Sequence, residues 1–520
     1  MIDGKKQIKI GAILSYVAII FNIIMGLVYT PWMIAQVGKE QYGLYTLATS
    51  LITFFVMDFG LSAATARYVA KYKAEENQQQ VNNFLGAIYK IYIVIDLILF
   101  VFLTIVFIFL ESIYVELTPT ELSQFKVVFL IAAAFTLVDL PFITLNGILT
   151  AYEKFIQLKL ADLLYKIVLV GLTVGGLLLG WGLYALVSVY ALSGILTIIY
   201  KLVVIKATTP VKVNLKYKDK KLSKEIVIFS LWVAISALAQ RLIFVITPSI
   251  LGIVASSTAI AVFGIVTLVE SYSYTVTTAI NGMFMPKISK IYLDDKPQEK
   301  LMPLMVKVGK FQFAVNGLII VGFAILGSSF INLWLSGDST FKDAYWGILL
   351  VIIPGLFFNS LQVANTALTV AGKVKEQALY SIAYGVLNVV LSFILASKFG
   401  VLGACVSIFV AYMARAVIYH IMHKRILKLN IWYFIKQCYF RMAPSIVITL
   451  ALGFVMNYFI PDAGWIRFLI KGIIVVAIYL ASTLFLCFNK IERKGFYQKI
   501  GKMLNRKQKS VNGDGNERDN

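Results

Sequence analysis

The segment YTPWMIAQVGKEQYGLYTLATSLI, residues 29–52, is echoed in the second half of the chain by ITPSILGIVASSTAIAVFGIVTLV, residues 246–269. In both segments a Thr-Pro pair, Thr30-Pro31 or Thr247-Pro248, stands where one apolar run gives way to the next through a short turn. Internal repeats at corresponding places are typical of membrane proteins built from two related bundles of helices. The repeat therefore predicts two helical lobes.

Long apolar runs extend from this repeat through the whole chain. A helix needs about 20 predominantly apolar residues to cross a bilayer, and about fourteen runs meet that length. The runs cover residues 10–35, 44–66, 84–110, 125–150, 158–179, 182–205, 226–251, 258–285, 306–334, 345–370, 378–396, 401–422, 435–459 and 466–488. Hydrophobic residues make up 59% of the sequence and charged residues 14%, against roughly half and a quarter in a soluble domain. We predict an all-α integral membrane protein with two six-helix lobes and two further helices.

Basic residues are concentrated in alternate loops. If the N-terminus is cytoplasmic, the lysines and arginines gather in the cytoplasmic loops, above all in KVNLKYKDKKLSK, residues 212–224. The opposite loops hold few cations, and ESIYVELTPTEL, residues 111–122, is acidic. This alternation follows the positive-inside rule and predicts an even number of spans with both termini in the cytoplasm. The same rule accounts for the net charge of +22, so that we do not expect nucleic-acid binding.

The longest cytoplasmic loop divides the chain. We predict an N-lobe in residues 1–205, a linker in 206–225, a C-lobe in 226–430, two extra helices in 431–488 and a basic cytoplasmic tail in 489–520. The end of the tail is polar and predicts disorder.

Ionisable residues within the spans are the main candidates for function, because they usually face a protein interior or a water-filled cavity. Six lie well inside the runs, namely Asp58, Asp96, Asp139, Arg241, Glu270 and Arg415. Others lie nearer the cytoplasmic ends, namely Lys90, Asp162, Lys166, Lys307, Lys310 and Arg441. We expect the second group to reach the membrane interface with their long side chains.

Polar residues also recur on single faces of the runs. Glu270, Tyr274 and Asn281 share one face of the eighth run at three- and four-residue spacing. Gln362 belongs to a similar stripe in the tenth run. Stripes of this kind can serve helix packing as well as ligand binding, so both interpretations stay open.

Arg241 follows Gln240 in the seventh run, and two roles are open for it. At about 1.5 Å per residue, Arg241 and Glu270 lie roughly 12 and 18 Å below the same turn, which allows an ion pair. Alternatively, Arg241 and Arg415 bind an anionic ligand, for which the fork of donors on a guanidinium is suited. In that second case the aspartates of the first lobe would take part in ion coupling or gating.

No arrangement typical of a catalytic, metal or cofactor site occurs in the sequence. There is no G-x-S-x-G, P-loop or H-E-x-x-H motif, and the outer loops are short. His420 and His423 have no neighbouring cysteine, and the three cysteines, Cys405, Cys438 and Cys487, lie in or beside apolar runs without paired spacing. We predict a protein that is not an enzyme and that has no cofactor and no metal.

Three motifs give the chain a resemblance to a known family. Residues 38–43 form a G-x-x-x-Y-G turn, and the following run ends in D-x-G-L, residues 58–61, before a basic cap. The pattern N-x-x-L-T-x-x-x-K begins at both Asn146 and Asn365. Together these motifs resemble bacterial polysaccharide exporters of the Wzx type, in the multidrug/oligosaccharidyl-lipid/polysaccharide exporter superfamily.

The resemblance implies a MATE-like fold and transport by alternating access. It implies that the substrate is an oligosaccharide linked to undecaprenyl diphosphate, carried across the bacterial cytoplasmic membrane for capsule or exopolysaccharide synthesis. It further implies contact with membrane lipids, a polysaccharide polymerase and chain-length machinery. Carried over by position, Arg241 and Glu270 fall in helices that face a central cavity. Relatives often have an aspartate in the seventh helix, where this chain has Gln240 and Arg241.

Two other functions stay open. A drug or cation antiporter of the same fold fits the aspartates of the N-lobe, although the number of spans and the arginines count against it. A membrane-embedded polysaccharide polymerase or ligase would need a sizeable outer loop, which the sequence lacks.

Overall fold

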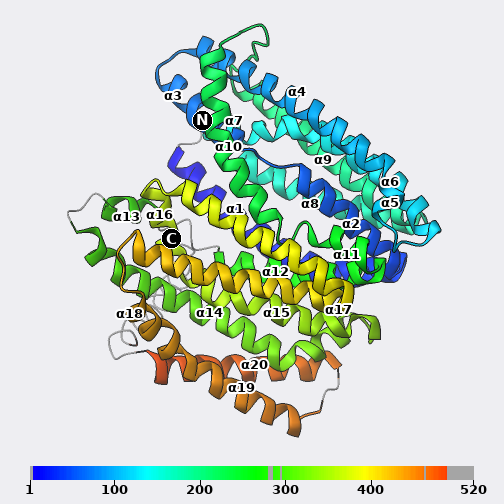
Figure 1. Cartoon of the computed structure of the whole chain (residues 1–520), viewed down its shortest axis with the longest axis vertical. Helices are drawn as coiled ribbons and strands as arrows, with labels where there is room; N and C mark the ends of the chain where they lie inside the picture. Colours follow the sequence, from blue (N-terminus) through cyan, green and yellow to red (C-terminus); the bar gives the residue numbers. More distant parts are fainter. Residues whose placement is uncertain (1–3, 279–284, 293–295, 462–463, 489–492, 494–520) are drawn as a thin grey trace, which may run out of the picture.

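The computed structural model describes residues 4–278, 285–292, 296–461, 464–488 and 493 (Figure 1). In these residues the chain forms helices and no strand. Among the described helices, eleven are long and apolar enough to cross a membrane. The all-α membrane fold is thereby confirmed, whereas the count of about fourteen spans stays a prediction. The tail for which the sequence predicts disorder lies outside the described residues.

The first half of the chain forms the N-lobe. Its elements are α1 (Gly4–Val37), α2 (Lys39–Phe55), α3 (Leu61–Ala74), α4 (Gln78–Ile108), α5 (Leu110–Ile113), α6 (Pro119–Asp139), η1 (Leu140–Ile143), α7 (Thr144–Ala151), α8 (Phe155–Leu178) and α9 (Gly182–Thr208). Helix α8 packs against α9 and α1, and α2 packs against α6 and α9. The short helix α7 packs beside α3.

The C-lobe repeats part of this arrangement. Its elements are α10 (Lys220–Arg241), α11 (Thr247–Val254), α12 (Ser257–Thr278), α13 (Met285–Tyr292), α14 (Pro297–Trp334), η3 (Ser339–Phe341), α15 (Lys342–Ser360), α16 (Gln362–Val370) and α17 (Val374–Arg425). Helix α15 packs against α14 and α17, and α16 packs beside α13 as α7 does beside α3. The paired short helices α7 and α16 contain Asn146 and Asn365 of the repeated motif.

Two extra helices cover one side of the C-lobe (Figure 1). The elements are α18 (Ile431–Ile435), η4 (Lys436–Phe440), α19 (Arg441–Phe459), α20 (Gly464–Ser482) and η5 (Thr483–Cys487). Ile325 of α14 and Tyr479 of α20 are buried in the small apolar cluster that joins α20 to the C-lobe.

Several runs that the sequence predicts as single helices are broken, among them 345–370 between α15 and α16, and two of the breaks lie beside Arg241. The run 44–66 is interrupted between α2 and α3, where Gly60 has φ 77°, a left-handed value that glycine adopts readily. The run 226–251 is interrupted at residues 242–246, between α10 and α11. Asn388 of α17 donates hydrogen bonds to the carbonyl oxygens of Leu242 and Ile243, at 2.9 and 3.2 Å. These bonds satisfy backbone groups that the break exposes inside the lobe.

The boundary between the fifth and sixth runs is confirmed, because α8 ends at Leu178 and α9 begins at Gly182. The eleventh and twelfth runs are continuous in α17 except at Gly400, whose φ of 54° and ψ of −133° are not helical. Both positions are turns between antiparallel helices.

The two lobes meet through α2 and α12. A Cβ on Gly43 would lie 2.0 Å from the carbonyl oxygen of Ser257, so only glycine permits this approach of the two backbones. Close by, Lys39 donates a hydrogen bond to Thr340 at 2.8 Å. We call the end of the molecule that carries these contacts the Gly38 end, after the turn between α1 and α2.

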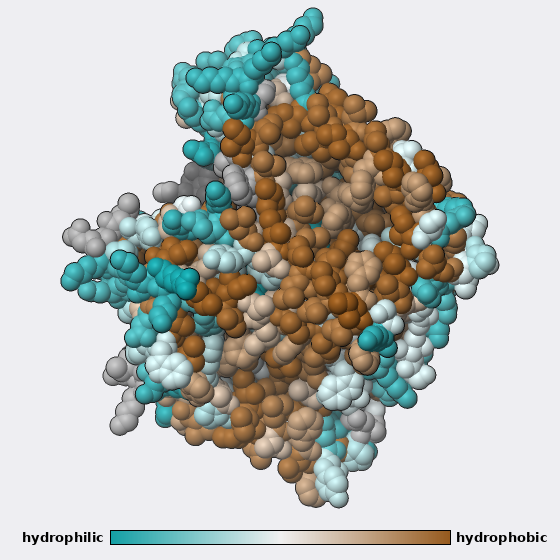
Figure 2. Space-filling view, in the orientation of Figure 1, coloured by the Kyte–Doolittle hydropathy of each residue, from teal (hydrophilic) through white to brown (hydrophobic). Residues whose placement is uncertain are grey.

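The opposite end carries α3, α13, α16 and α18, on the left of Figure 1. Most of the lysine-rich loops lie there, and we call it the basic end. In Figure 2 apolar side chains cover the middle of the visible face, whereas hydrophilic side chains gather at the ends. This distribution fits a multi-pass membrane protein.

The segment between the lobes is docked on the N-lobe. The backbone N–H of Asn214 donates to the carbonyl oxygen of Asn82 at 3.0 Å, and Lys90 donates to the carbonyl oxygen of Tyr217 at 2.6 Å. Gly86 of α4 permits the contact, because a Cβ there would lie 1.9 Å from the Asn214 oxygen. The predicted linker is thus held against α4.

Candidate functional site

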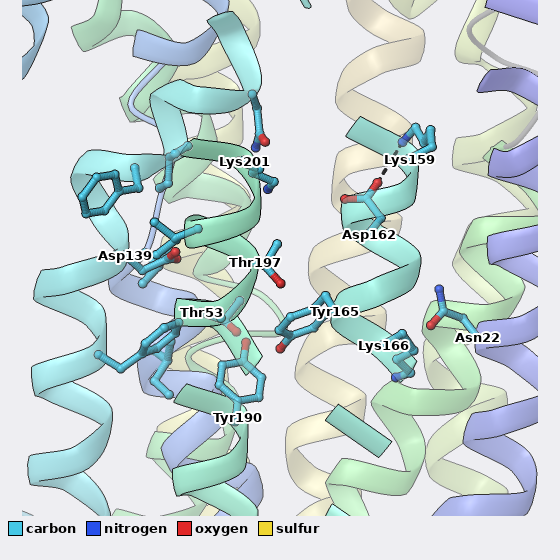
Figure 3. A pocket seen from close by; sticks show the side chains of 18 of the residues that line it. Asn22, Thr53, Asp139, Lys159, Asp162, Tyr165, Lys166, Tyr190, Thr197 and Lys201 are labelled. Carbon is cyan, nitrogen blue, oxygen red and sulfur yellow. Dashed lines mark hydrogen bonds and ion pairs between the residues drawn. The ribbon is translucent and has the colours of Figure 1, made fainter. Parts of the chain in front are cut away.

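A cavity of about 710 Å³ lies inside the N-lobe (Figure 3). Its walls come from α1, α2, α6, α8 and α9, with η1 and α7 at one edge, and every lining residue lies between Ile19 and Lys201. A volume of a few hundred Å³ is typical of sites for small ligands and parts of larger ones. The cavity is therefore a feature of one lobe.

Charged side chains line this cavity from three helices. Lys159, Asp162 and Lys166 belong to α8, Lys201 to α9 and Asp139 to α6. Lys159 Nζ lies 3.1 Å from Asp162 Oδ2. Within the described part of the chain, Lys166 and Lys201 form no ion pair and no hydrogen bond. Lys201 still interacts electrostatically with Asp139 and Asp162. The three lysines outnumber the two aspartates, so the cavity keeps an excess of positive charge for a ligand.

Uncharged polar groups complete the walls. The rings of Tyr165 and Tyr190 are perpendicular, with centroids 6.2 Å apart, and Thr53 and Thr197 lie near them (Figure 3). Asn146 has a buried Oδ1 without a hydrogen-bond partner. A buried polar atom of this kind is costly unless water or a ligand pairs with it. The walls thus offer donors and acceptors beside the lysines.

The structure places the three N-lobe aspartates predicted for ion coupling, Asp58, Asp96 and Asp139, in different surroundings. Asp139 lines the cavity. Asp58 accepts a hydrogen bond from the backbone N–H of Ser62 at 3.0 Å, in the first turn of α3. Asp96 lies on α4, away from the cavity, with a buried Oδ1 that has no partner. Only Asp139 therefore joins the cavity lysines.

Arg241 connects two of the broken runs. It is the last residue of α10, and its Nη2 donates to the carbonyl oxygen of Val56, at the end of α2, at 3.2 Å. Its Nη1 is buried without a partner. No ion pair joins Arg241 to Glu270 in the described chain. In this conformation Arg241 therefore binds the N-lobe backbone instead.

Glu270 and Tyr274 of α12 line a far smaller pocket inside the C-lobe, of about 20 Å³. That volume holds about one water molecule. Beside it, the side-chain oxygen of Asn316 accepts hydrogen bonds from Thr277 and from Asn359, both at 3.2 Å. Thr277 of α12 thus takes part in packing within the C-lobe, whereas Tyr274 is 47% exposed.

Arg415 of α17 is surrounded by aromatic rings. Its guanidinium carbon lies 3.4 Å from the centroid of Phe358, and the rings of Tyr384, Tyr412 and Tyr419 lie 5.3 to 5.9 Å away. Its Nε is buried without a hydrogen bond. Contacts between a guanidinium and ring faces are attractive, so the charge of Arg415 is held within the lobe. Tyr412 also lines the pocket of Glu270.

The remaining predicted site residues lie apart from these clusters. Gln240 is exposed on α10. Gln362 accepts a hydrogen bond from Asn365 at 3.1 Å within α16. Asn281 lies outside the described residues.

The sequence interpretation missed the cavity lysines. It assigned Lys166 and Asp162 to the interface, and the structure corrects this, because both line the cavity. Long side chains near a span end are ambiguous in sequence, since the same residues suit an interface or an interior. Lys201 was not singled out, although it falls inside the run 182–205. Its position made it a candidate, because ionisable residues inside spans often face a cavity or a protein interior.

The chemistry of the cavity suits an anionic group. Ammonium groups bind phosphate oxygens as point charges, and their attraction is strong where water is partly excluded. Within the described residues no group of three or more histidine, cysteine or acidic side chains could hold a metal ion.

Solved structures share this fold. The lipid II flippase MurJ in an inward closed conformation superimposes with a TM-score of 0.70 at 15% identity, over 91% of this chain and 98% of that one. A multidrug resistance MATE family transporter of the MOP superfamily, in an inward-facing conformation, gives 0.64 at 15% identity, over 81% and 99%. A MOP superfamily transporter from Pyrococcus furiosus gives 0.58 at 16% identity, over 82% and 97%. These likenesses show that the chain shares the fold of these three proteins.

Comparison with sequence families identifies the family of this chain. Residues 8–292 match the family described as Polysaccharide biosynthesis protein, and the chain belongs to that family. No curated protein matches the chain.

Proposed function

We propose that the protein carries an oligosaccharide linked to undecaprenyl diphosphate across the bacterial cytoplasmic membrane, by alternating access. The observation that carries this proposal is the N-lobe cavity, in which Lys166 and Lys201 form no hydrogen bond or short ion pair with the described residues, and three lysines face two aspartates. The diphosphate is the part of such a lipid that needs these cations. The polysaccharide family supports a glycan cargo, and a polymerase and chain-length machinery would take up the exported glycan.

The arrangement of the lobes supports a proposal for the side of the membrane from which the cargo enters the cavity. Contacts between α2 and α12 close the Gly38 end, which we assign to the outer face. The basic end then faces the cytoplasm, with both termini, as the positive-inside rule requires. The cavity would therefore take its cargo from the cytoplasmic side.

A drug or cation antiporter is the second candidate. Asp139 and Asp162 in the cavity favour it, because carboxylates bind cationic drugs and protons. The three lysines of the same cavity oppose a cationic cargo by charge repulsion. We therefore prefer the anionic lipid.

The test is a flipping assay with purified protein in liposomes that contain a glycan linked to undecaprenyl diphosphate. We expect the double variant Lys166→Ala/Lys201→Ala to lose export about 100-fold, because hydrogen bonds to charged groups contribute about 1.5–3 kcal/mol each. Replacing both lysines by arginine should retain part of the activity, since the charges remain.

The matched control is Lys71→Ala/Lys206→Ala, which removes two exposed lysines outside the cavity. The control should export at the wild-type rate. Equal export by the cavity variant and the wild type, at equal protein amounts, would remove the basis of the proposal.

A further inference from the structure

A second hollow lies in the C-lobe at the Gly38 end, where the turn between α14 and α15 folds over the helix ends. Its volume is about 390 Å³, and its lining includes Ser328, Asn332, Asp338, Lys342, Tyr345 and Trp346. None of its lining residues belongs to the N-lobe cavity. It is therefore a separate site.

One wall of this hollow is aromatic and fixed. The Tyr345 hydroxyl donates to the carbonyl oxygen of Ala324 at 2.8 Å, and its ring stacks on Phe323 with centroids 5.9 Å apart. The Trp346 ring meets Tyr345 at 66°, with centroids 4.9 Å apart. Trp346 is nevertheless 58% exposed. Tyr345 thus holds the indole ring of Trp346 in place, and the exposed part of that ring can contact a ligand.

The other walls carry hydrogen-bonding groups of mixed kind. Asp338 Oδ1 accepts from the backbone N–H of Thr340 at 2.9 Å, and this bond lowers the pKa of Asp338, so that it stays a carboxylate. The side chains of Ser328, Asn332 and Lys342 make no hydrogen bond or ion pair within the described chain. Hydroxyl, amide, carboxylate and ammonium groups therefore all face one small space.

This combination matches a pyranose sugar. A sugar ring has an apolar face of C–H groups, which packs on an indole ring, and a rim of hydroxyls, which donate and accept hydrogen bonds. A simple anion would gain from Lys342 but would be repelled by Asp338. A purely apolar ligand would leave the polar groups of the wall unpaired.

We propose that the hollow between α14 and α15 is a carbohydrate-binding site, in which Trp346 stacks on a sugar ring and Asp338 and Asn332 bind its hydroxyls. The proposal goes beyond the export function, because it assigns sugar binding to a second site at the opposite end from the basic loops. Thr340, which accepts the hydrogen bond from Lys39 of the N-lobe, lies next to this site. A bound sugar thus lies beside a contact that joins the lobes.

The test is saturation-transfer NMR with full-length protein in lipid nanodiscs. The probes are the methyl glycosides of glucose, galactose, mannose and N-acetylglucosamine. We expect saturable binding of at least one glycoside, with transfer to the ring C–H protons. Trp346→Ala and Asp338→Asn should each weaken it at least tenfold.

Trp181→Ala is the matched control, because Trp181 is 60% exposed at the same end, in the turn between α8 and α9. It should bind as the wild type does. The proposal is overturned if no glycoside binds saturably, or if Trp346→Ala leaves binding unchanged. It is also overturned if Trp346→Ala alters only the phospholipid retained on the protein in native mass spectrometry, which would make Trp346 a membrane anchor.

These experiments test the sugar-binding proposal and the export proposal independently. The glycosides contain no diphosphate, so loss of the cavity lysines should leave their binding unchanged. Conversely, a protein that binds no glycoside can still move the lipid through the N-lobe.

Discussion

The two lobes share helix arrangements and differ in what fills them. The N-lobe encloses about 710 Å³ with five charged side chains on its walls. In the C-lobe the pocket lined by Glu270 and Tyr412 has a volume of only about 20 Å³, and the guanidinium of Arg415 packs on the ring of Phe358. A charge inside a span is therefore no sign of a binding site by itself. The space around the charge and the lack of a partner decide its role.

The largest effect should follow a reversal of charge in the N-lobe cavity. Lys201→Glu should lower export by about 100-fold or more, because it removes a charge-assisted contact of about 1.5–3 kcal/mol and adds repulsion. Flipping in liposomes measures it. Lys206→Glu, in the exposed last turn of α9, should leave export near the wild-type rate. If both variants export equally, the cavity charge has no special role.

In the C-lobe, Arg415→Ala should act on stability and not on transport itself. The loss of contacts to four rings should lower the free energy of unfolding by about 1–3 kcal/mol, seen as a lower melting temperature in detergent. Arg415→Met should recover part of this loss by filling the space. A variant with normal stability that exports nothing would show that Arg415 binds cargo, and the contrast between the lobes would fail.

Arg241 lies between the lobes and should give a moderate effect. Arg241→Ala removes the bond to the Val56 carbonyl, and we expect export to change about tenfold, since a hydrogen bond from a charged group contributes about 1.5 kcal/mol at the low end of its range. Adding Glu270→Gln should not restore the rate, because the structure shows no ion pair between these residues. Restoration by the second substitution would reveal that pair in another conformation.

The smallest effect should come from Asp162, whose ion pair with Lys159 is partly exposed. Asp162→Asn should change stability by less than about 0.5 kcal/mol and export less than twofold. Glu75→Gln, which breaks the exposed pair with Lys71 outside the cavity, is the comparison. A large loss of export in the first variant alone would favour an acidic residue as the principal cargo ligand.

The fold was predictable where one physical signal dominates. Apolar length predicted an all-α membrane fold, which eleven long apolar helices among the described residues confirm. Gly180 and Gly182 marked a turn that α8 and α9 confirm. Hydropathy does not record whether a run is one helix, so the break at residues 242–246 was missed. The backbone of this break is hydrogen-bonded by Asn388, a residue far away in the sequence.

The site was predictable only in part. Asp139 was singled out and lines the cavity. Lys166 was assigned to the interface, because its length suits a surface as well as an interior. Whether a charge meets empty space or an aromatic ring depends on tertiary packing, which a single sequence does not display. This explains why Arg415 was predicted as a site residue although aromatic rings surround it, whereas Lys201, which lines the cavity, was overlooked.

The docking of the linker on α4 has a mechanical consequence. Asn214 and Tyr217 are hydrogen-bonded to Asn82 and Lys90 of α4. This part of the loop is therefore fixed to the N-lobe and is not a flexible connection between the two lobes. Beyond it, Asp219 accepts a hydrogen bond from the backbone N–H of Leu222 at 2.9 Å and starts α10 at once. Only the residues between Tyr217 and the start of α10 at Lys220 are therefore left to act as a hinge. A movement of the C-lobe relative to the N-lobe at the basic end would have to be accommodated by the residues between Tyr217 and α10.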